Sequence, residues 1–319
     1  MHKPVPEASH DPAAIALREA LARADGVLAR VNPILEHLLA TPDHSLFSEE
    51  LVARIGGMCR NLAAQVLRAQ AEATGEAGRE AFAELHSDEL AGHLFACPRI
   101  LSHCHSLGME WQLATRMEAQ YGLDPVLSPG IQDLIASTEE GQASTAMATL
   151  AAQARFAQSQ KRMELPLAEL SADLFHEVLL AWRRFNGERR SDAMIRAEAK
   201  LRNTYDESGS RLSLLARLVA GIADGDRELL SIDRAGVALF ATALAVRSGQ
   251  PRALAILATN EGQAARLALS LRAAGLDAQE ANAQLLRINP QADPHPALIA
   301  ISPEEARTML SDAGTMGTS

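Results

Sequence analysis

The stretch EELVARIGGMCRNLAAQVLRAQAEA, residues 49–73, shows most clearly how this chain folds. Its apolar residues recur mostly at steps of three and four, which is the spacing of one face of an α-helix. These residues are Leu51, Ile55, Met58, Leu62, Val66 and Leu67. The segment is therefore predicted to be an amphipathic helix that buries this face.

The same spacing extends over most of the chain, and polar caps and glycines mark where its helices begin and end. Asp277 with Glu280, and Ser302 with Glu305, have the spacing of capping boxes at helix starts. Helices are predicted over 11–30, 49–73, 232–248, 251–259, 261–274 and 278–288, while no segment alternates as a strand does. The short connections predict an all-α fold of consecutive antiparallel helical hairpins.

Composition agrees with helices and excludes several classes of protein. Of 319 residues, 47% are hydrophobic but only 3% are aromatic, which is typical of helices packed through Ala and Leu. No apolar run is long enough for a membrane span, and the first residues lack the apolar core of a signal peptide. Three cysteines are too few for a disulfide scaffold, so we expect a reducing, cytoplasmic location.

The net charge of −10 argues against non-specific nucleic-acid binding by the chain as a whole. Helix breakers are dense between residues 122 and 141, where Pro125, Pro129, Gly130 and Gly141 fall close together. We therefore expect a helical domain over 11–125 and a helical-repeat domain over 126–310. Loose tails are expected over 1–10 and 311–319.

Parts of the second half resemble a known family. The runs AAQARFAQSQKRMELPLAEL (151–170), SADLFHEV (171–178), FATALAVRSGQP (240–251) and LRAAGL (271–276) carry the resemblance. They are similar to a bacterial, mainly alphaproteobacterial, domain family of unknown function, over about residues 143–290. The resemblance implies an all-helical fold with a HEAT-like or solenoid stack in the C-terminal half. It implies no activity, because the family has no agreed catalytic residues.

The run 153–169 is unusually polar for a buried helix and its exit. Phe156 and Met163 are seven residues apart and would mark a buried seam, while Arg155 and Arg162 form a parallel row beside it. We expect Arg155, Arg162 and Glu164 to form a ridge that binds a partner protein. The alternative is a solvated face with local ion pairs.

A second candidate surface is basic. Residues 183–202 carry seven Arg or Lys side chains against three acidic ones, around a turn at Asn186-Gly187. Grouped guanidinium groups can bind carboxylates or phosphates through paired hydrogen bonds. Arg183, Arg184, Arg189 and Arg190 are therefore candidates for contacting a protein partner or, alternatively, a nucleic acid. The simpler interpretation is a solvated corner, since exposed ion pairs contribute little to stability.

Metal-ligand side chains are concentrated between His86 and His105. His93 and Cys97 are four residues apart, so they share a helix face, and Pro98 could bend the chain to bring in His103. These three residues would be the ligands of a zinc site. The alternative is that they are ordinary histidines and a cysteine of a helical bundle, since the spacing matches no standard zinc motif.

No motif for nucleophilic catalysis or phosphate binding occurs in the sequence. It has neither a glycine-rich serine elbow nor a GxxxxGK loop. We therefore expect a non-enzymatic helical scaffold or regulatory module that binds a protein partner and needs no cofactor. The two alternatives are a nucleic-acid-binding regulator that uses the arginine-rich turn and a zinc-binding helical protein.

Overall fold

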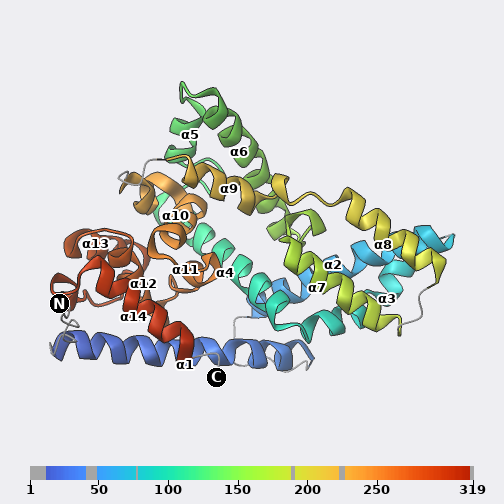
Figure 1. Cartoon of the computed structure of the whole chain (residues 1–319), viewed down its shortest axis with the longest axis horizontal. Helices are drawn as coiled ribbons and strands as arrows, with labels where there is room; N and C mark the ends of the chain where they lie inside the picture. Colours follow the sequence, from blue (N-terminus) through green and yellow to red (C-terminus); the bar gives the residue numbers. More distant parts are fainter. Residues whose placement is uncertain (1–11, 41–48, 77, 188–190, 223–226, 317–319) are drawn as a thin grey trace, which may run out of the picture. The chain divides into compact units, whose positions relative to one another are not determined.

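The computed structural model describes residues 12–40, 49–76, 78–187, 191–222 and 227–316. These residues form fourteen α-helices and five short 3-10 helices, and none of them lies in a strand (Figure 1). The predicted all-α fold is confirmed. No helix in these ranges combines the length and the apolar character that crossing a bilayer requires.

Contacts within the chain define two compact units. The first unit comprises residues 1–30, 227–232 and 240–319, and the second comprises 31–226 and 233–239. The boundary expected after residue 125 lies inside the second unit instead. The breakers near residue 125 turn the chain within one core, because the helices on both sides of them pack together there. Figure 1 labels the helices of both units.

The second unit is built around helix α2 (Glu49–Thr74), which contacts α3, α4, α7 and α8. The predicted apolar face of α2 is buried, since Ile55, Met58 and Leu62 are fully enclosed. All six apolar residues that the sequence places on this face of α2 are buried. The other helices of this unit are α3 (Arg79–Phe95), α4 (Pro98–Tyr121), α5 (Pro129–Ile135), α6 (Glu140–Lys161), α7 (Ala172–Phe185), α8 (Asp192–Thr204) and α9 (Arg211–Ala220). Two 3-10 turns, η1 (Leu167–Glu169) and η2 (Glu207–Gly209), lie between them.

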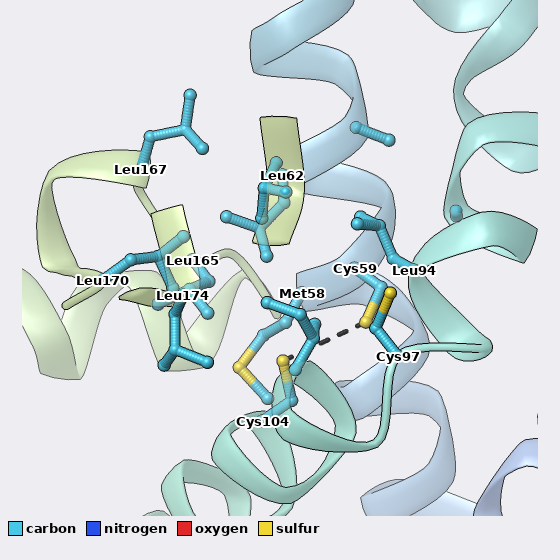
Figure 2. Packing of buried hydrophobic residues seen from close by; sticks show 14 of the residues in the cluster. Met58, Cys59, Leu62, Leu94, Cys97, Cys104, Leu165, Leu167, Leu170 and Leu174 are labelled. Carbon is cyan, nitrogen blue, oxygen red and sulfur yellow. Dashed lines mark hydrogen bonds between the residues drawn. The ribbon is translucent and has the colours of Figure 1, made fainter. Parts of the chain in front are cut away.

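The core of the second unit consists mainly of aliphatic side chains (Figure 2), and a few polar groups are oriented within it. Trp182 on α7 is only 1% exposed, and its indole Nε1 donates a hydrogen bond to Gln70 Oε1 on α2 at 2.6 Å. A buried indole N–H needs such an acceptor, because leaving it unsatisfied would cost the full desolvation penalty. This bond therefore fixes the orientation of the largest side chain in the core.

The segment that follows α6 lies directly on α2. Asn61 Oδ1 accepts the Leu165 amide at 3.2 Å, and the Gln65 side chain bonds both Leu165 O and the Leu167 amide at 2.9 Å. Met163, in the same segment, has a left-handed φ of 56°. A Cβ at Gly57 would lie 2.7 Å from Met163 Cβ, so only glycine allows this close approach.

The first unit contains the start of α1 (Pro12–Ala40) and the C-terminal helices. Helix α12 (Ala264–Ala273) packs against α13 (Ala278–Ile288) and α14 (Pro303–Met316). Arg266 on α12 forms an ion pair with Asp25 on α1, and Gln263 Nε2 donates to Ala24 O at 2.8 Å. Also in this unit are η3 (Arg227–Leu230), α11 (Arg252–Leu257), η4 (Glu261–Gln263) and η5 (Pro296–Ile299). Helix α10 (Ile232–Ser248) is divided, because its residues 233–239 belong to the second unit.

Most of the helix ends follow the local signals in the sequence. Asp277 and Glu280 form the predicted capping box, and Ser302 and Glu305 exchange the same two hydrogen bonds. The helix predicted over 261–274 begins instead as a 3-10 turn. The C-terminal tail expected from residue 311 is also wrong in part, because α14 continues to Met316. The expected tail over 1–10 lies outside the described residues.

Replacing Gly57 with alanine should destabilise the second unit. The added Cβ would overlap Met163, and overpacking of this kind costs about 1–3 kcal/mol. Gly92, on α3, is the matched control, because a Cβ there has no atom within 4 Å. Gly92→Ala should raise the free energy of unfolding by about 0.5–1 kcal/mol through helix propensity. Urea unfolding followed by circular dichroism measures both, and equal effects would contradict the close contact.

Candidate functional site

A pocket of about 570 Å³ opens in the second unit beside the end of α6. Its walls come from α6, the segment 162–169, η2 and the start of α9, with one side chain from α4. The lining is mixed: Leu107, Phe156, Leu165, Pro166 and Leu212 are apolar, whereas nine of the sixteen lining residues are polar or charged. The volume lies in the range of ligand-binding pockets.

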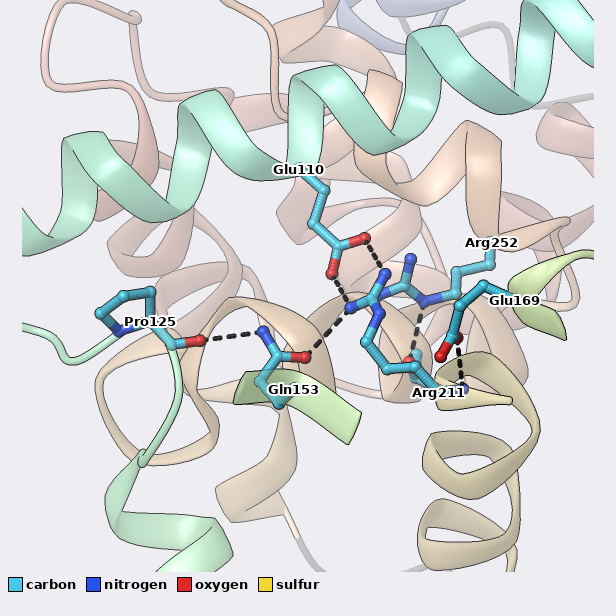
Figure 3. A network of polar contacts seen from close by, with 7 residues as sticks. Glu110, Pro125, Gln153, Glu169, Arg211 and Arg252 are labelled. Atoms are coloured by element: carbon cyan, nitrogen blue, oxygen red, sulfur yellow. Dashed lines mark hydrogen bonds and ion pairs between the residues drawn. The ribbon is translucent and has the colours of Figure 1, made fainter. Parts of the chain in front are cut away.

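An ion pair between Glu110 and Arg211 lies inside the second unit (Figure 3), and Arg211 also lines the pocket. Arg211 on α9 donates two hydrogen bonds to the Glu110 carboxylate on α4, at 2.7 and 2.9 Å. Both side chains are only 1% exposed. The Arg211 guanidinium also lies 3.7 Å from the centre of the Phe156 ring. Two paired hydrogen bonds and an aromatic face stabilise a charge that would otherwise be very costly to bury.

Helix α6 joins this network through Gln153. Its Oε1 accepts a hydrogen bond from Arg211 at 3.1 Å, and its Nε2 donates to Pro125 O at 2.9 Å (Figure 3). The amide therefore satisfies a third guanidinium N–H and also a carbonyl of the loop before α5. As a result α4, α6 and α9 are linked through one buried set of hydrogen bonds.

Two loops beside the pocket cap each other's helices. Glu169 Oε2, in η1, accepts the amide of Arg211 at the start of α9, at 2.8 Å. Glu207 Oε2, in η2, accepts the amide of Ala172 at the start of α7, at 3.2 Å. Negative charge is favourable at helix N-termini, so both carboxylates have a structural role. Asp206 similarly accepts bonds from Ser208, and these lower the pKa of its carboxyl group.

The three residues of the predicted ridge all line this pocket. Arg155 and Arg162 are exposed, and Glu164 is half-buried between the solvent and the pocket. Arg162 Nε and Glu164 Oε2 form an ion pair at 2.8 Å. Phe156 is buried as expected, whereas Met163 is only half-buried because α6 ends at Lys161 and the chain turns sharply there. The three residues expected to form a ridge therefore lie along one wall of the pocket, and their role in partner binding stays a prediction.

The arginines of the basic segment lie elsewhere in the second unit. Arg183 and Arg202 both donate to the Glu198 carboxylate, and the hydrogen bond from Arg183 is the main reason that the pKa of Glu198 is lowered. Arg184 Nη2 contacts Cys97 Sγ at 3.3 Å. Neither Arg183 nor Arg184 lines the pocket. Arg189 and Arg190 fall outside the described residues.

The residues of the predicted zinc site do not come together as a ligand set. Cys97 Sγ contacts His93 O at 3.4 Å, and the His93 ring packs edge-on against Phe185, with centroids 6.0 Å apart. His103 lies one turn into α4. Across the described ranges, no three His, Cys, Asp or Glu side chains are grouped so that they could hold a metal ion. The backbone at Pro98 starts α4 and does not bring His103 to His93.

All three cysteines of the chain are buried in the core of the second unit (Figure 2). Cys59 Sγ and Cys104 Sγ are 3.9 Å apart. Their hydrogen bond, together with burial, raises the pKa of Cys59 well above the ordinary thiol value. Burial also raises the pKa of Cys97, although Arg184 acts in the opposite direction. Cys59 and Cys97 are therefore protonated at neutral pH, and all three cysteines act as small apolar core residues.

The buried ion pair has only one weak signal in the sequence. Glu110 lies on α4 in a helical row with Leu107, Trp111 and Ala114, where an apolar residue would be expected. Such an isolated acid on an apolar face is the one signal that could have identified it. Arg211 follows the cap residue Ser210 and could not be told from an exposed residue in the first turn.

Comparison of the chain with protein-family models, curated proteins and solved structures finds no significant match. The all-helical fold implied by the family resemblance is present in the described residues. Membership of that family and its HEAT-like repeats have no support from these comparisons.

Breaking the buried ion pair should be costly, whereas removing both charges should not be. Arg211→Met leaves the Glu110 carboxylate buried without its guanidinium, and we expect a loss of about 3–5 kcal/mol in the free energy of unfolding. The double variant Glu110→Leu/Arg211→Met should recover most of that loss. Arg68→Met, which removes an exposed ion pair with Glu80, is the control and should cost less than about 1 kcal/mol. If the double variant loses as much stability as Glu110→Leu and Arg211→Met lose in sum, the coupling between the two charges is contradicted.

His105 should make stability depend on pH. Its side chain is buried on α4, and burial lowers its pKa to about 4. Between pH 6.5 and 4 the unfolded chain binds a proton at this residue that the folded chain does not bind. The free energy of unfolding should therefore decrease as the pH falls through this range, by up to about 3 kcal/mol from His105. His105→Leu should reduce this decrease in urea titrations, and an unchanged pH dependence would contradict the assignment.

Proposed function

We propose that this protein is a non-enzymatic binding module that holds a segment of a partner protein in the pocket beside α6. The observation that carries the proposal is that Arg155, Arg162 and Glu164 line one pocket together with apolar residues such as Phe156 and Leu165. Binding energy in protein interfaces is concentrated in a few anchors that fill pockets, with polar groups around them. The pocket combines both parts within a single unit of the chain.

The polar groups of the pocket favour binding over catalysis. Glu169 caps α9, Asp206 accepts bonds from Ser208, and Arg211 is paired with Glu110. Each of these side chains already serves the local structure, so none is presented as an acid, base or nucleophile beside a substrate. Their hydrogen bonds instead fix the walls of the pocket.

The pocket is also held in shape by the neighbouring helix. Asn61 and Gln65 on α2 bond the main chain at Leu165 and Leu167, which forms one wall. A site held in its binding conformation avoids part of the entropy that a flexible loop would lose on binding. This rigidity supports recognition of a defined partner segment.

The other expectations from the sequence remain proposals. No contact among the described residues favours nucleic-acid or zinc binding over partner binding. The HEAT-like repeats, the bacterial origin and the cytoplasmic location are likewise proposed from the sequence. The three buried free thiols fit a reducing compartment.

Blocking the pocket tests the proposal. A photoreactive phenylalanine analogue at Ala168, an exposed residue that lines the pocket, should cross-link one protein that mass spectrometry can identify. The purified partner should then bind Ala168→Trp at least tenfold more weakly than the wild type, because the indole fills the pocket. Ala216→Trp, on an exposed position of α9 away from the pocket lining, is the matched control. Equal binding by both variants would overturn the proposal.

A further inference from the structure

Helix α3 exposes a large apolar side chain among acids. Leu85 is 77% exposed. Three acids are exposed within four residues of it on the same helix, and they are Glu84, Asp88 and Glu89. Among the described residues, only Arg60 brings a permanent positive charge within ion-pair distance of them, at 3.9 Å from Asp88. His86 lies 3.9 Å from Glu89 but is charged only when it is protonated. Leu85 and the three acids, here called the Leu85 patch, are therefore an apolar side chain in a negative surface.

A groove in the same unit is lined by residues of α7 and α8. Its volume is about 230 Å³, and four of its seven lining residues are apolar, namely Trp182, Met194, Ile195 and Ala199. Ile195 is 51% exposed, so this part of α8 also presents an apolar side chain to the solvent. An apolar cavity of about 150 Å³ accommodates a benzene molecule, so this groove has room for one leucine side chain.

The lining of the groove is positive because two arginines share one carboxylate. Its other three residues are Arg183, Glu198 and Arg202. Both arginines donate hydrogen bonds to Glu198, whose side chain is 17% exposed and thus less exposed than either arginine. Beyond the lining, the exposed charges of Asp192 and Arg196 on α8 offset each other. One positive charge is therefore left unbalanced, and the more exposed groups are the guanidinium groups.

The apolar part of the groove favours a protein over a nucleic acid. Nucleic acids are bound mainly by cations and hydrogen-bond donors that contact phosphate, and this needs no exposed Ile195. Interfaces between proteins instead place an apolar anchor in a pocket with polar groups around it. The Leu85 patch has such an anchor, and its charge is opposite to that of the groove.

We propose that the Leu85 patch of one copy of this chain docks into the α7–α8 groove of a second copy. Leu85 enters the groove beside Ile195, and the acids around it face Arg183 and Arg202. Complementary charges of this kind fix the orientation of the two partners. The inference goes beyond the proposed function, because neither surface lines the pocket beside α6.

Sedimentation velocity of the full-length chain tests the inference. The contact is small, so association should require roughly tens of micromolar protein. We expect the average mass to rise above that of one chain between about 1 and 200 μM. The mass can exceed that of a dimer, since contacts between two different surfaces form rings or chains. Raising sodium chloride from roughly 50 to 300 mM should weaken the association.

Substitutions at the two surfaces should each prevent the association. Leu85→Asp and Ile195→Asp remove the two apolar side chains, and each should weaken self-association at least tenfold. Met147→Asp is the matched control, because Met147 is 52% exposed on α6 and belongs to neither surface, so it should stay within twofold of the wild type. Circular dichroism confirms that each variant is folded.

Mixing two variants identifies the contact itself. The Leu85→Asp chain keeps its groove, and the Ile195→Asp chain keeps its patch. An equimolar mixture should therefore form heterodimers, although neither variant associates alone. Arg202→Glu should also weaken self-association of the otherwise natural chain, whereas Arg217→Glu, an equal charge change at an exposed position of α9, should not.

Three results would overturn the inference. They are a wild-type chain that stays monomeric throughout, an association that survives Leu85→Asp or Ile195→Asp, and a mixture of those two variants that remains monomeric. If the chain stays monomeric and a labelled single-stranded DNA binds the wild type but not Arg202→Glu, the groove belongs to a nucleic acid instead. Each of these results leaves the proposed function intact, because that proposal is tested at Ala168.

Discussion

The ion pair between Glu110 and Arg211 joins helices α4 and α9 across the interior of the second unit. A buried carboxylate or guanidinium is tolerated only when its partner and its hydrogen bonds are all in place. That requirement determines where α6 lies, because Gln153 must reach Arg211 on one side and the loop at Pro125 on the other. It also places Phe156 over the guanidinium. The part of the pocket lined by Arg211 and the packing of three helices therefore depend on the same pair of charges.

Near the pocket, short polar contacts hold segments that have little regular structure of their own. Glu169 caps the helix that follows the loop of Glu207, and Glu207 caps the helix that follows the loop of Glu169, so the two loops hold each other in place. Asn61 and Gln65 hold the segment after α6 against α2. These side-chain hydrogen bonds hold the loops in place, as backbone hydrogen bonds between strands do in a sheet. They explain how a surface composed largely of turns can present a pocket of defined shape.

Local features of the fold could be predicted from the sequence, and features that depend on distant residues could not. Caps such as Asp277 with Glu280 act within four residues, so their spacing identifies them directly. Arg155 and Arg162 could be placed side by side because they are two turns apart on one stretch of chain, and both line the pocket. The Glu110–Arg211 pair spans 101 residues, and no local pattern connects its members. The division into units failed for the same reason, since glycines and prolines show where the chain turns but not what it packs against next.

Because of where the cysteines lie, only one of the two units can react with a thiol reagent. Cys59, Cys97 and Cys104 all belong to the second unit, and the first unit contains no cysteine at all. A thiol-specific reagent in solution therefore reports only on opening of the second unit, without any engineered label. Paired with a probe of total helix content, the natural sequence can show whether one unit melts before the other or both melt together.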